Sequence, residues 1–63
     1  MPFKLTLIQL KELQKDVDPN IQLMADAVIF YKKHKNTKNK NIAWAAFMKL
    51  SETTRKRIEK MEK

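Results

Sequence analysis

Apolar residues near the start of the chain recur at intervals of three or four positions. The stripe consists of Leu7, Leu10, Leu13 and Val17. Such spacing places side chains on one face of an amphipathic helix. Thr6 and Gln9 form the T-x-x-Q pattern of a capping box, and Leu5 and Leu10 are spaced for a hydrophobic staple. The pattern therefore predicts a helix over residues 6–17.

A second helix is expected over residues 19–34. Asp18 can cap it and Pro19 can open it, because proline suits the first helical position and disfavours helical geometry at the residue before it. Its apolar residues surround nearly the whole helix: Ile21, Leu23, Met24, Ala25, Ala27, Val28, Ile29, Phe30 and Tyr31. A helix of this kind is usually the buried centre of its domain. We therefore expect these side chains in the core.

Residues 32–41 contain lysine, asparagine, threonine and histidine and no apolar residue. We expect the second helix to run into this segment and the remainder to form a loop. Asn41 can then cap a short third helix over 42–50, and Ser51 can cap a fourth over 52–62.

The predicted fold class is all-α, a compact bundle of three to four short helices in a single helical domain, 1–63. Glycine is absent and proline occurs twice, which argues against the Gly-containing turns of β-hairpins. A chain of this size buries only about 60% of the surface that it exposes when unfolded. With no cysteine and one histidine, its stability must come from helix packing, self-association or a partner.

The net charge of +7 is divided unevenly along the chain. Residues 1–31 carry three lysines and four acidic residues, whereas residues 32–63 carry eleven Lys or Arg and three glutamates. This asymmetry favours binding of a polyanion by the second half. The alternative is that the lysines only keep a small domain soluble, which would not require their concentration in one half.

The candidate nucleic-acid-binding residues come from the 32–41 segment and the last helix. They are Lys32, Lys33, Lys35, Lys38, Lys40, Arg55, Lys56, Arg57 and Lys60. Lysine is a compact point charge suited to phosphate contacts rather than to base reading. We therefore expect low sequence specificity and a steep dependence on salt, with DNA favoured over RNA as the partner. A solvated connector is the alternative interpretation of the 32–41 segment.

The residue types that catalysis requires are largely missing. Ser51 is the single serine and suits a helix cap, there is no cysteine, and no carboxylate neighbours His34 in the sequence. A phosphate-cradling loop is not possible without glycine, and no ligand spacing indicates a metal site. We therefore expect a protein that is not an enzyme and needs no metal or cofactor.

No stretch of the chain is suited to crossing a membrane. The longest apolar runs, 27–31 and 42–48, are far shorter than the ~20 residues of a spanning helix, and no secretory signal is apparent. We expect an intracellular protein, in the cytoplasm, nucleoid or nucleus, with no membrane partner.

Residues 47–58 resemble the junction of the second and third helices in HMG-box proteins. In that family an aromatic residue, usually tryptophan, is followed by Leu-Ser, acidic residues, a lysine and a further aromatic. The matching positions are Phe47, Leu50, Ser51 and Arg55, with Ile58 in place of the last aromatic. Residues 27–35 vaguely resemble the family's first helix. The resemblance implies minor-groove DNA binding and DNA bending, although the chain has shorter third and last helices and a capped helix where the family has an extended basic strand.

A protein partner is the main alternative to nucleic acid. A helical module of this composition would suit the regulation or inhibition of a larger enzyme, for example as a phage or mobile-element accessory factor. The apolar second and third helices also allow a homodimer. Trp44 fits a core position beside Phe47, which we favour, or an exposed ring that stacks on a base.

Overall fold

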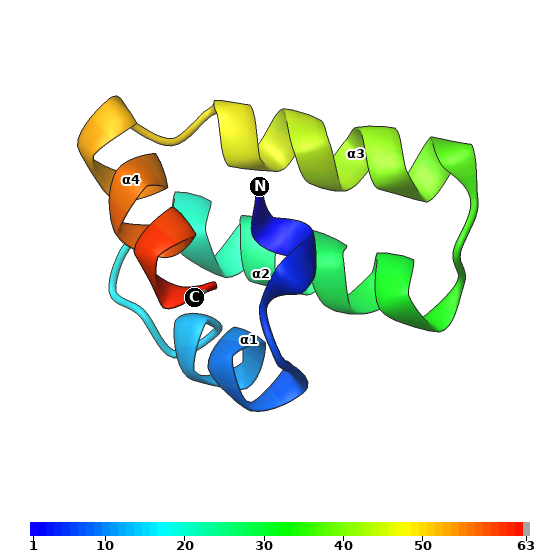
Figure 1. Cartoon of the computed structure of the whole chain (residues 1–63), viewed down its shortest axis with the longest axis horizontal. Helices are drawn as coiled ribbons and strands as arrows, with labels where there is room; N and C mark the ends of the chain where they lie inside the picture. The colour runs from blue at the N-terminus through cyan, green and yellow to red at the C-terminus, as the bar shows by residue number, and fades with distance from the viewer. Residues whose placement is uncertain (63) are drawn as a thin grey trace.

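The computed structural model describes residues 1–62, and this part of the chain is helical apart from its connections. Its elements are the 3₁₀ helix η1 (Pro2–Lys4) and the α-helices α1 (Leu7–Leu13), α2 (Pro19–Lys33), α3 (Thr37–Met48) and α4 (Glu52–Met61). α2 and α3 run antiparallel along the longest dimension of the molecule, and α4 lies at the end where α2 begins (Figure 1). The predicted all-α fold class is confirmed.

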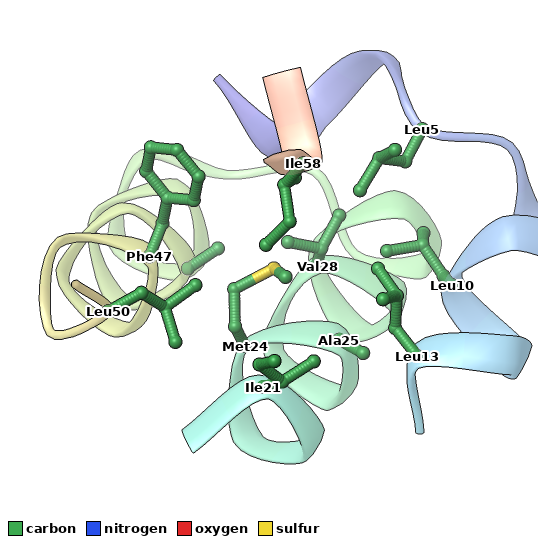
Figure 2. Close-up of a cluster of buried hydrophobic side chains, with 11 residues drawn as sticks. Leu5, Leu10, Leu13, Ile21, Met24, Ala25, Val28, Phe47, Leu50 and Ile58 are labelled. Atoms are coloured by element: carbon green, nitrogen blue, oxygen red, sulfur yellow. The ribbon is translucent and has the colours of Figure 1, made fainter. Parts of the chain in front are cut away.

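One hydrophobic core lies between the helices, and α2 passes through it. Figure 2 shows Leu5, Leu10 and Leu13 on one side of α2, Phe47 and Leu50 on the other, and Ile58 approaching from α4. α2 packs against both α1 and α3. The buried apolar residues are Leu5, Leu10, Leu13, Ile21, Met24, Ala25, Val28, Ala43, Phe47, Leu50 and Ile58.

The start of α1 follows the predicted local pattern. Thr6 Oγ1 accepts the Gln9 backbone N–H at 3.2 Å, and Gln9 Oε1 accepts the Thr6 backbone N–H at 2.9 Å. Leu5 and Leu10 are both fully buried, as the hydrophobic staple requires. Gln9 also donates from Nε2 to the Met61 carbonyl at 2.8 Å, which ties α1 to the end of α4.

The end of α1 was predicted wrongly. The helix stops at Leu13 rather than residue 17, and Val17 is 95% exposed instead of joining the core stripe. After the helix end, the Asp16 carboxylate accepts the Asp18 backbone N–H at 2.9 Å, an Asx turn that keeps residues 16–18 out of helical geometry. Leu7, the first residue of the expected stripe, is also exposed.

α2 begins where predicted but is only partly buried. Asp18 caps it by accepting the Asn20 backbone N–H at 2.9 Å, and the helix ends at Lys33. Leu23 and Phe30 are 59% and 53% exposed, so the expectation that they belong to the core was wrong. The reason is the small size of the domain, because the elements that pack on α2 cover only part of its circumference.

α3 begins five residues earlier than the predicted start at Ile42, so the expected loop over the later part of 32–41 is mostly helix. Asn36 is the N-cap and accepts the Asn39 backbone N–H at 2.8 Å. The buried Asn39 side chain donates to the His34 carbonyl at 2.7 Å. This amide replaces the apolar residue that would have marked the first turn as helical. Asn41 is exposed within the helix and caps nothing.

Replacing the caps tests this boundary directly. We expect Asn36→Ala to destabilise the fold by about 1 kcal/mol, because an N-cap side chain is lost, and to lower Tm by roughly 4–8 °C. Asn41→Ala is the matched control and should leave Tm unchanged or slightly higher, since alanine is the better helix former. Thermal unfolding followed by circular dichroism measures both. A larger fall in Tm for Asn41→Ala than for Asn36→Ala would instead support the predicted start of the helix near residue 42.

α4 was predicted correctly to within one residue. Ser51 caps it by accepting the Thr54 backbone N–H at 3.3 Å, and the helix ends at Met61. Ile58 is the residue that α4 buries in the core, and Met61 packs partly against it. Most of the helix surface faces solvent.

Candidate nucleic-acid interface

Five of the candidate lysines lie where α2 turns into α3, at one end of the long dimension (Figure 1). Lys32 and Lys33 are in the last turn of α2, Lys35 is in the connection, and Lys38 and Lys40 are at the start of α3. We refer to these five residues as the lysine tip.

The lysine tip lies in a stretch of chain without negative side chains. The sequence has no Asp or Glu from residue 27 to residue 51, but it has six lysines there. Lys33, Lys35, Lys38 and Lys40 are exposed, and within residues 1–62 no ion pair joins them to a carboxylate. Four ammonium groups are therefore available to an external anion.

Lys32 is placed differently from the other four. Its Nζ donates to the Phe3 carbonyl at 3.2 Å, and the side chain is half-buried. The neighbouring Tyr31 ring meets the Phe3 ring edge-on, with 5.3 Å between the centroids. Lys32 therefore helps to hold η1 against α2, and its ammonium group is less available to an external anion than those of the exposed lysines.

The start of α3 adds to the positive potential of the lysine tip. A helix N-terminus carries a partial positive charge from its unpaired backbone N–H groups. The first turn of α3 contains no acidic residue to offset that charge, and Lys38 lies within it. A cation there is unfavourable by a few tenths of a kcal/mol or more, whereas a bound anion would relieve the repulsion.

The fold uses two of the four neutral polar side chains of the segment. Asn36 caps α3, and the Asn39 amide is buried against the His34 carbonyl. Thr37 and Asn41 are exposed. Among these four side chains, Asn39 is the one that uses its donor group within residues 1–62, so it is the one removed from reading base edges.

The candidate cations of α4 are not brought to the lysine tip. α4 lies at the other end of the long dimension, which measures 28 Å (Figure 1). Three of its four cations are occupied: Arg55 donates to the Met48 carbonyl at 3.4 Å, Lys56 pairs with Glu52 at 3.4 Å, and Arg57 pairs with Asp16 at 3.5 Å. Lys60 is exposed. The two groups of cations therefore form separate surfaces.

The residues behind the HMG-box resemblance have structural roles in this fold. Phe47, Leu50 and Ile58 are buried in the core, and Ser51 caps α4. Packing and capping account for the pattern without a DNA contact. Trp44 is 39% exposed, so the favoured core position is wrong in part, although its ring lies 5.7 Å from that of Phe47.

A groove of about 590 Å³ runs along the outer side of the α2–α3 pair, and it was not predicted from the sequence. α2 contributes Leu23, Asp26, Ala27 and Phe30, and α3 contributes Ile42, Ala45, Ala46 and Lys49. Both sets follow the spacing i, i+3, i+4, i+7 of one helix face. On α2 these residues, apart from Asp26, form a second apolar stripe beside the core stripe. The stripe is visible in the sequence, but it was not recognised because the whole helix was expected to be buried.

Comparison with known proteins gives no assignment: no family model, curated protein or solved structure matches this chain. No helix in residues 1–62 is long and apolar enough to cross a membrane. The same residues contain no group of three or more His, Cys, Asp or Glu side chains that could hold a metal ion.

Proposed function

We propose that this protein binds the phosphate backbone of nucleic acid, duplex DNA above RNA, through the lysine tip. The observation that carries the proposal is the set of four exposed lysines, unpaired within residues 1–62, in a stretch without carboxylates beside the N-terminus of α3. Phosphate contacts of this kind hold a protein on the backbone and carry no sequence information. The buried Asn39 amide, which donates to the His34 carbonyl, is not available to read a base edge, and this supports low sequence specificity.

The proposal is narrower than the set of residues that the sequence indicated. Arg55, Lys56 and Arg57 have partners within the chain, and α4 is remote from the tip. We therefore assign the interface to the lysine tip alone.

The number of phosphates neutralised can be measured from the salt dependence of binding. For duplex DNA the slope of log K against log salt is about −0.9 per phosphate, so four tip lysines predict a slope of about −4, and all nine candidates predict about −8. Mobility shifts with random duplex DNA, single-stranded DNA and RNA over a salt series give this slope. A flat slope, or no binding at low salt, rejects the function, and a slope near −8 rejects the restriction to the tip.

A further inference from the structure

The α2–α3 groove exposes large apolar side chains that the core does not use. Leu23, Phe30 and Ile42 are 59%, 53% and 52% exposed, and all three line the groove. Contiguous exposed apolar surface on a small soluble domain marks a site of association. Three alanines lie between these residues, at 27, 45 and 46, and leave room for side chains from outside.

The shape of the groove indicates what occupies it. α2 and α3 are antiparallel, and each presents one face at helical spacing, so together they form half of a four-helix arrangement. A second α2–α3 pair completes that arrangement. Its Leu23, Phe30 and Ile42 would enter the space above the alanines, as large side chains do between packed helices.

The charges of the groove favour a second copy of the same chain. Asp26 lies on the α2 side and Lys49 on the α3 side, so the groove has no net charge in a protein of +7. In a two-fold symmetric contact each patch meets itself, and a residue i that touches j is matched by j touching i. Asp26 of each copy can then pair with Lys49 of the other. Within residues 1–62 Lys49 has no ion pair, and Asp26 accepts only the Gln14 amide at 2.5 Å.

We propose that two copies associate groove to groove, with α2 of each copy packed on α3 of the other to form a four-helix bundle. The proposal rests on the groove and does not depend on nucleic-acid binding.

Sedimentation velocity of the nuclease-treated protein, from micromolar to millimolar concentration, tests the dimer. We expect the wild type to shift from monomer to dimer. Leu23→Glu should raise the apparent dissociation constant at least about 100-fold, because it would bury an unpaired carboxylate in the contact. Ile8→Glu is the matched control on α1, where Ile8 is 73% exposed and outside the groove, and should associate like the wild type.

Charge exchange tests the pairing of Asp26 with Lys49. Asp26→Lys alone and Lys49→Asp alone should each remain monomeric, since each homodimer would oppose like charges. An equimolar mixture should form heterodimers, because both cross-pairs become attractive. If Asp26 paired with Lys49 of its own chain, the mixture would show no preference for heterodimers.

Each outcome bears on the proposal. A wild type that is monomeric at millimolar concentration overturns it and leaves the groove to a helix of a different protein. Association that survives Leu23→Glu, or is lost in Ile8→Glu, places the contact elsewhere. Mixed variants that fail to associate overturn the packing of α2 on α3 of the other copy. The salt series with DNA is read separately, so a failure of the dimer and a failure of nucleic-acid binding can be told apart.

Discussion

Reversing Lys35, Lys38 and Lys40 to glutamate is expected to lower DNA affinity about 100-fold. An exposed ion pair contributes up to about 1 kcal/mol, and about 1.4 kcal/mol corresponds to a tenfold change in affinity. Loss of three contacts therefore gives about two orders of magnitude before the repulsion from three new carboxylates is added. Mobility shifts at low salt measure the loss.

The same variant should fold at least as well as the wild type. Lys38 occupies the first turn of α3, where the helix dipole disfavours a cation. A glutamate at this position is expected to contribute about 0.3–1 kcal/mol, which raises Tm by a few degrees in a domain of this size. Loss of binding together with a higher Tm would separate function from stability, because a damaged fold would lower both.

A second triple variant controls for net charge. Lys11, Lys56 and Lys60 are exposed and lie outside the lysine tip. Their reversal to glutamate changes the net charge by the same amount, so long-range attraction to DNA falls equally. We expect this variant to bind much more tightly than the tip variant. Equal losses in the two variants would contradict the restriction of the interface to the tip, whether the cause is the overall charge or contacts made by Lys56 and Lys60 of α4.

Phe47→Ala is expected to remove most of the stability of the protein. Phe47 is 2% exposed and is among the largest fully buried side chains. Truncating a buried phenylalanine to alanine costs about 3–5 kcal/mol. A domain of 63 residues has a total stability of roughly 3–9 kcal/mol. Urea unfolding should therefore show a greatly reduced midpoint or no folded baseline.

Phe30→Ala is the matched control for this substitution. Phe30 is 53% exposed, and its ring lies 5.0 Å from the His34 ring on the surface of α2. The same truncation here should cost less than about 1 kcal/mol, as surface substitutions usually do. Both variants are compared at low protein concentration, so that association through the groove does not contribute. Equal costs at the two positions would contradict the assignment of the core.

The features that could be predicted from the sequence depend on neighbouring residues. The capping box of Thr6 and Gln9, the cap at Asp18 and the cap at Ser51 were all found by pattern, because each involves groups within three residues of one another. The start of α3 was missed for a local reason as well. Asn36 and Asn41 are equally good caps by residue type, and the polar first turn gave no apolar periodicity with which to choose between them.

The sequence by itself determined that the protein is helical, where three of its helices begin, and that its cations are concentrated in the second half. Only the tertiary structure decided that these cations form two separate groups. It also decided that one face of α2 stays exposed and lines one side of a groove. The physical reason is that capping and helical spacing are settled within a few residues of chain. Which faces are covered depends on how many helices a 63-residue chain can place around α2.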